Sequence, residues 1–146
     1  MTSTPPSSHA QAHGRFRHLG ESECLDLLTT TTVGRVAFVD DDDRLQLLPL
    51  NFGLIDDRIY FRTAPDSVLA SLATPRRVAF GVDHHADVFR EGWNVTVRGT
   101  TRQVVEPAVI QCVTSWSRLH PWAKGTRDLV IALDRESAEG RWVHGA

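Results

Sequence analysis

The sequence predicts a mainly β domain, a small antiparallel barrel of six or seven strands with short helices between them. Segments rich in β-branched and aromatic residues recur along the chain, and clusters of aspartate and glycine separate them. The length of 146 residues suits one compact core. Residues 1–14, rich in Ser, Thr and Pro, are expected to form a disordered tail, which leaves residues 15–146 for the folded domain.

The first half of the folded domain predicts one short helix followed by three strands. Residues 20–30 place Cys24, Leu25, Leu27 and Leu28 on a partly apolar helical face. The strands expected next form an antiparallel meander with aspartate-rich turns, over residues 33–40, 45–55 and 58–63. Pro49 interrupts the second of these strands and indicates an edge or a bulge, because proline cannot donate a ladder hydrogen bond.

The second half predicts two more helices and four more strands. Pro65 and Pro75 bound a short helix over residues 65–75, and a longer helix is expected over residues 107–119. Gly99 stands where the longest strand could bend sharply. The strands expected here cover residues 77–83, 93–105, 128–136 and 140–144.

Charge and composition exclude several classes of function. The 16 basic and 18 acidic side chains leave a net charge of −2, so no nucleic-acid partner is expected. No stretch approaches the roughly 18 apolar residues of a membrane helix, and no secretory signal is evident, so a cytoplasmic location away from membranes is expected. Cys24 and Cys112 lack metal-site spacing and are expected to be buried thiols.

One cluster of side chains has the composition of a metal site. Asp83, His84, His85 and Asp87 lie within five positions, between two predicted strands. Adjacent histidines in a strand project to opposite faces, and a loop would have to fold tightly to bring these side chains onto one ion. We therefore expect residues 83–92 to form a solvated hairpin connection, and no metal site.

Motifs of self-contained catalysis are absent from the chain. The sequence contains no GxSxG, P-loop or GxGxxG pattern. A small barrel with few catalytic residues of its own can still position the reactive ring of a cofactor. The absence of these motifs therefore favours a bound cofactor that supplies the chemistry.

Six segments in order resemble one known family. They are VGRVAF, LPLNF, IYFRTAPDS, RVAFGVD, EGWNVTVRG and HPWAKGTRD. Together they resemble the pyridoxamine 5'-phosphate oxidase-like, FMN-binding split-barrel family, particularly its short actinobacterial-type branch. The resemblance implies a six-stranded split barrel and a homodimer, with FMN bound in two equivalent clefts at the dimer interface.

The same resemblance implies which residues hold the cofactor. Arg62, Thr63 and Ser67 match the segment that faces the FMN phosphate and ribityl chain, which suits a guanidinium and two hydroxyls. The flavin ring is expected against the strand carrying Pro49, Leu50 and Asn51, with Trp93 and Asn94 of the fifth strand beside it, and with Trp122 and Arg127 reaching the partner's flavin.

Val68 departs from the family pattern, because many relatives carry a basic residue directly after the matched serine. A phosphate anchor is therefore missing, and Arg35, or Arg127 of the partner chain, could replace it. The departure also leaves the deazaflavin F420 open as an alternative cofactor.

The expected function is that of an FMN-dependent oxidoreductase of an unknown small molecule, including reduction of nitro compounds as some relatives perform. Oxidation of pyridoxamine 5'-phosphate itself is not expected, because the chain has no counterpart of the C-terminal substrate segment of those enzymes. An F420-dependent reductase, or a non-catalytic flavin or haem binder, remain alternatives.

Overall fold

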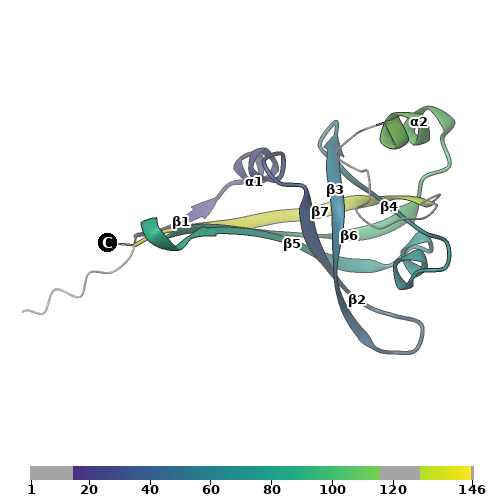
Figure 1. Cartoon of the computed structure of the whole chain (residues 1–146), viewed down its shortest axis with the longest axis horizontal. Coiled ribbons are helices and arrows are strands. Elements are labelled where there is room, and N and C mark those ends of the chain that lie inside the picture. The colour runs from purple at the N-terminus through teal and green to yellow at the C-terminus, as the bar shows by residue number, and fades with distance from the viewer. Residues whose placement is uncertain (1–14, 116–128, 146) are drawn as a thin grey trace, which may run out of the picture.

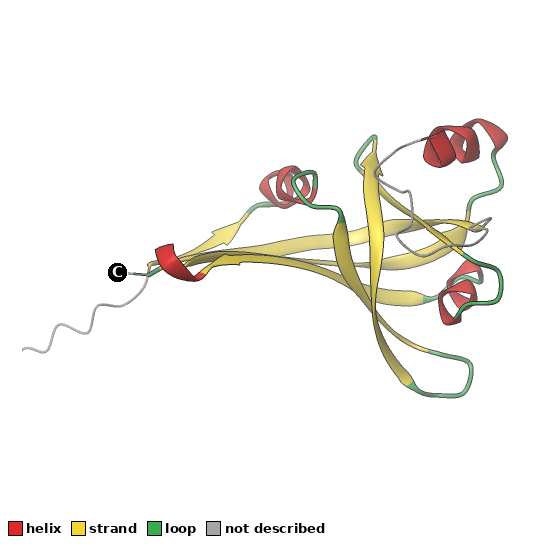
Figure 2. Ribbon diagram, viewed as in Figure 1, coloured by secondary structure: helices red, strands yellow, loops and turns green. Residues whose placement is uncertain are grey.

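The computed structural model describes residues 15–115 and 129–145, most of which form strands (Figures 1 and 2). The elements in order are β1 (Arg15–Leu19), α1 (Glu21–Leu28), β2 (Val33–Val39), β3 (Leu45–Ile55), β4 (Arg58–Thr63), the 3-10 helix η1 (Val68–Ala73), β5 (Arg77–Ala86), the 3-10 helix η2 (Asp87–Phe89), β6 (Glu91–Gln103), α2 (Pro107–Ser115) and β7 (Leu129–His144).

Six strands close into a ring and the seventh extends it. The sheet order is β1-β7-β4-β3-β2-β5-β6, every pairing is antiparallel, and β6 pairs back onto β7. The predicted mainly β antiparallel barrel is therefore confirmed. The chain between the predicted tail and the first helix forms β1, which was not predicted, because Leu19 is the only buried residue among its five and gives no apolar alternation.

Strand β7 belongs to two parts of the molecule. Leu129–Leu133 pairs with β4 in the barrel, whereas Gly140–His144 pairs with β1, and the other edge of β7 pairs with β6. Figure 1 shows the sheet of β1, β5, β6 and β7 extending away from the barrel. The expectation of two separate strands over residues 128–136 and 140–144 is thus wrong. Residues 137–139, between the two predicted strands, also belong to β7. Polar side chains do not interrupt the strand there, because this part of it is mostly exposed.

The bend predicted at Gly99 is present as a register shift. Arg98 pairs with Ser137 and Gly99 pairs with Arg135, so that Glu136 is left without a partner residue in β6. A Cβ atom on Gly99 would lie 2.2 Å from the carbonyl oxygen of Asp134, a distance that no side chain tolerates. The close approach of the two backbones at this bulge therefore requires glycine.

The core lies inside the barrel, where inward-facing residues alternate with exposed ones along the strands, as in β2. Cys24, Leu25 and Leu28 of α1 are buried against it. A smaller cluster, which includes Tyr60 and Val113, packs beneath α2. The largest fully buried side chains of the main core are Phe52, Phe80, Leu28, Ile59, Leu72 and Ile131.

The two cysteines differ in environment. Cys24 is buried, and burial raises the pKa of its thiol, so that the neutral thiol is favoured. Cys112 is exposed, which corrects the expectation that both thiols are buried. Helix α2 is described only to Ser115, so part of the predicted helix over residues 107–119 lies outside the described residues.

Pro49 lies at a partly open edge, as predicted. It is opposite Arg35 of β2, whereas β4 pairs with β3 only from Phe52 onward. The helix predicted over residues 65–75 is shorter and is a 3-10 helix. None of the described helices is long and apolar enough to cross a membrane.

We predict that Gly34→Ala lowers the free energy of unfolding by about 1–3 kcal/mol, because it overpacks the core. The new Cβ would lie 2.4 Å from Cζ of Phe80, whose ring is buried edge-to-face against Phe52. Gly81→Ala is the matched control, because the nearest atom to its Cβ would be 4.0 Å away. Urea unfolding measures both; equal stability of the two variants would contradict the packing role of Gly34.

Candidate functional site

The outward-facing residues of five neighbouring strands form one continuous surface. Arg35 of β2 is opposite Pro49 of β3 and Gly81 of β5, and Gly81 is opposite Thr96 of β6, which is opposite Glu139 of β7. Three hollows of about 150, 310 and 260 Å³ lie along this surface, and each shares lining residues with the next. We call them the first, second and third hollow, and together the outer groove.

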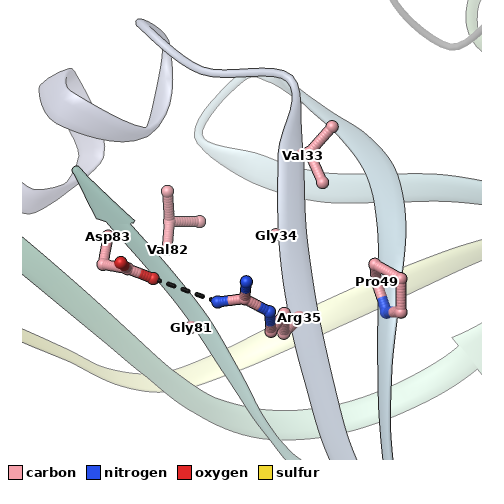
Figure 3. Close-up of a pocket in the computed structure, with 7 residues that line it drawn as sticks. All are labelled: Val33, Gly34, Arg35, Pro49, Gly81, Val82 and Asp83. Atoms are coloured by element: carbon pink, nitrogen blue, oxygen red, sulfur yellow. Dashed lines mark hydrogen bonds and ion pairs between the residues drawn. The ribbon is translucent and has the colours of Figure 1, made fainter.

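The first hollow lies between β3, β2 and β5 and contains an ion pair (Figure 3). Nη1 of Arg35 is 3.3 Å from Oδ1 of Asp83, and the two side chains are 61% and 55% exposed. An ion pair this exposed contributes only about 0.2–1 kcal/mol. The guanidinium of Arg35 can therefore leave Asp83 for an anionic ligand at small cost.

The second hollow has a floor of small residues. Ala37, Ala79 and Gly81 face outward on two neighbouring strands, with Leu47 at the rim. Because these side chains are short, the sheet is left hollow and largely apolar here, which suits the face of a planar ring. Its volume of about 310 Å³ is at the lower end of the usual range for ligand sites, and among the described residues only the outer face of the sheet lines it.

The third hollow is lined by charged and polar side chains of β1, β6 and β7. Arg98 donates a hydrogen bond to Glu139. That bond, together with the positive charges of Arg98 and Arg141, holds the pKa of Glu139 below its usual value. Asn94 and Thr96 line both the second and the third hollow, so the two are continuous.

The segment predicted to hold a phosphate forms a compact turn. The Ser67 hydroxyl donates to the carbonyl oxygen of Ala64 at 2.9 Å, so the 2.5 Å contact with Thr63 is a bond donated by the Thr63 hydroxyl. Thr63 is buried, and Arg62 beside it is half-buried on the other face of β4. The hydroxyl of Thr63 thus stabilises the turn through its hydrogen bond to Ser67.

Arg62 lies at the point where the pairing between β3 and β4 ends. Phe52 and Phe61 form the last pair between these strands, and Asn51 and Arg62 are the next residues on either side. Both are half-buried, and alternation directs both away from the core that Phe52 and Phe61 enter. The two polar side chains therefore flank the open edge of β3 that also carries Pro49.

The remaining predicted ring contacts are divided between the two faces of the sheet. Pro49 lines the first hollow and Asn94 lines the second and third. Leu50 and Trp93 are buried in the core, so only their backbones can meet a ligand on the outer face. Trp122 and Arg127 lie outside the described residues. Val68 is 51% exposed and supplies no charge at the turn.

Sequence reasoning missed the charged side chains of the third hollow. Arg98 was predicted only as part of a strand, and Glu139 lies in the polar stretch that was taken to separate two strands. The alternation along β6 was the available signal, because Asn94, Thr96 and Arg98 occupy every second position. The partners on β7 and β1 could not be found without the long-range pairing.

The histidine cluster lies in a strand, which corrects the loop predicted over residues 83–92. Strand β5 continues to Ala86, with His84 opposite Trp93, and η2 makes the hairpin connection. Asp83 is paired with Arg35, and Nε2 of His85 is 3.7 Å from Oδ1 of Asp87. Within residues 15–115 and 129–145 no group of three or more His, Cys, Asp or Glu side chains could hold a metal ion.

Comparison with known proteins finds similarity over most of the chain. A family model described as pyridoxamine 5'-phosphate oxidase matches residues 20–142. An uncharacterised protein of Mycobacterium tuberculosis, Rv0080, is 30% identical over an alignment of 131 residues, and the match covers 84% of this chain and 82% of that protein.

Solved structures share the fold. The FAD binding protein from Mycobacterium smegmatis is 29% identical with a TM-score of 0.72, and the match covers 86% of this chain and 98% of that one. The FAD and haem binding protein from the same organism, 20% identical with a TM-score of 0.70, is matched over 88% of this chain and 74% of its own. The predicted split β-barrel is thereby confirmed.

Proposed function

We propose that this chain, which belongs to the pyridoxamine 5'-phosphate oxidase family, is a flavin-binding protein that supports oxidation and reduction of a small molecule. The observation that carries the proposal is the outer groove, where an exchangeable guanidinium adjoins a flat floor of small residues. The FAD binding protein from Mycobacterium smegmatis, 29% identical, supports the same class of ligand.

The residues present fit a flavin phosphate and ring. Arg62 and Asn51 offer hydrogen-bond donors where the pairing of β3 and β4 ends. Arg35 offers a second guanidinium, which can replace the basic residue that many relatives carry at the position of Val68. Ala37 and Ala79 leave space for one face of the ring. When bound, a flavin supplies hydride and electron transfer, while the chain binds, orients and shields it.

FMN is the smallest flavin that would use these contacts, and FAD contains the same phosphate and ring. The proposed role is therefore that of an FMN- or FAD-dependent reductase of a small organic molecule. F420 is the alternative ligand, since it too combines a planar ring with anionic groups.

Absorbance spectroscopy and ligand titration test this function. The purified protein is expected to be yellow with the two absorbance bands of oxidised flavin, or to acquire them when FMN or FAD is added. A protein that binds neither flavin would refute the proposal. Tight binding of F420 alone would show that the cofactor is the deazaflavin and not a flavin. A haem Soret band without flavin bands would identify a haem binder.

We predict that Arg62→Ala weakens FMN binding about ten- to a hundredfold, the loss of one charge-assisted hydrogen bond, but leaves riboflavin binding nearly unchanged. Only FMN carries the phosphate. Arg58→Ala is the matched control, because Arg58 is an exposed arginine at the other end of β4. Calorimetry measures both ligands; equal losses for FMN and riboflavin would remove Arg62 from the phosphate site.

The second wall of the site is proposed to come from a second copy of the chain. Leu45 and Leu47 are 86% and 66% exposed, and with Val39 they form an apolar strip on the outer face beside the second hollow. Exposed strips of this kind commonly mark protein interfaces. A homodimer would cover the strip and enclose the ring, and it would also bring Trp122 and Arg127 to the partner's site.

We predict that the double variant Leu45→Asp, Leu47→Asp is monomeric and binds flavin at least tenfold more weakly, because two buried charges at an interface are unpaired. Val88→Asp is the control: Val88 is 89% exposed in η2, away from the strip. Light scattering measures the mass. A monomeric wild-type protein, or a double variant that stays dimeric with unchanged flavin affinity, would contradict the shared site.

A further inference from the structure

The third hollow carries more positive than negative charge. Arg98 and Arg141 contribute two guanidiniums, and Glu139 contributes one carboxylate. Among the described residues Glu139 is hydrogen-bonded to Arg98, whereas Arg141 has no carboxylate within salt-bridge distance. Its guanidinium lies over the ring of Phe16, with Cζ 5.3 Å from the ring centre. The Arg141 guanidinium thus has no direct ion-pair partner among the described residues, although its positive charge acts on Glu139.

Further hydrogen-bond donors line the hollow together with Arg141. Asn94 and Thr96 line the hollow and make no side-chain hydrogen bond to another described residue. His18 of β1 lies opposite Arg141 and adds a further donor. A guanidinium with an amide, a hydroxyl and an imidazole beside it is a donor set that suits a phosphate group.

The position of the third hollow relates it to the proposed flavin site. Asn94 and Thr96 also line the second hollow, so the two hollows adjoin each other. At about 260 Å³ the third hollow has room for more than a single phosphate. The outer groove thus has an arginine at each end, Arg35 in the first hollow and Arg141 in the third, with the apolar floor between them.

We propose that the third hollow binds the phosphate of a separate phosphorylated small molecule beside the flavin, held by Arg141 with Asn94 and Thr96, and that Glu139 occupies Arg98 and limits the affinity. The proposal rests on the proposed flavin function, because this molecule would be the substrate of the bound flavin. The adenylate phosphate of FAD is not the occupant, because it shares a bridging oxygen with the flavin phosphate, which is proposed to lie at Arg62 and Arg35 on the other side of the apolar floor.

Calorimetric titration of the full chain with FMN and FAD, and of the FMN-loaded protein with ADP as a phosphorylated probe, tests the proposal. Arg141→Gln is expected to weaken ADP binding about tenfold or more, while FMN and FAD binding change less than about twofold. Glu139→Gln is expected to act in the opposite direction and to tighten the same ligand several-fold, because it removes the resident anion. Arg77→Gln, an exposed arginine on the same face outside the hollow, is the matched control.

A weakening confined to ADP supports the proposal. A loss of FAD affinity in Arg141→Gln would place the dinucleotide's own phosphate in the hollow and overturn it. ADP affinity that does not respond to Arg141→Gln, or that both variants shift in one direction, would also overturn it.

The test still gives an answer if the protein binds no flavin or if Arg141→Gln does not fold. A wild-type protein that binds no flavin would refute the flavin function, while ADP titration of the unloaded protein would still test the hollow. If Arg141→Gln does not fold, because Phe16 loses its contact, tighter binding by Glu139→Gln supports the proposal and unchanged binding overturns it.

Discussion

The pairing of β6 with β7 is the constraint on which the rest of the structure depends. It closes the ring of six strands and then continues beyond the barrel, where β1 joins the other edge of β7. The bulge at Gly99 lets β6 and β7 stay paired from the barrel into the extension beyond it. Only glycine fits at this bulge, because the backbone of Asp134 lies too close for any side chain. The same two strands therefore build the barrel wall and much of the third hollow.

Alternation along β2 and β5, and along β3 up to Phe52, separates stability from binding. Inward residues such as Phe52 and Phe80 fill the core, and Gly34 is small because Phe80 occupies the space that its side chain would need. Outward residues such as Ala37 and Gly81 are small for a different reason, since they leave the hollow in which a ring can lie. A substitution in one set thus changes folding, and a substitution in the other changes ligand binding.

Local patterns in the sequence predicted the barrel, the edge at Pro49 and the bend at Gly99. They failed where strands are exposed on both faces, as along most of β1 and in the continuation of β5 through His84, because apolar alternation is absent there. Within the site, alternation alone could have placed Leu50 on the inner face, between the outward Pro49 and Asn51. The meeting of Arg98, Glu139 and Arg141 depends on pairing between distant strands, which one sequence does not reveal.

The central place of β7 has a consequence for how the protein is made. Its partners β1, β4 and β6 all precede it in the chain. During translation, the edges of β4 and β6 stay unpaired until β7 has left the ribosome, and unpaired strand edges are prone to associate with other chains. The nascent chain thus passes through an open-edged state, in which binding by a chaperone would protect it most.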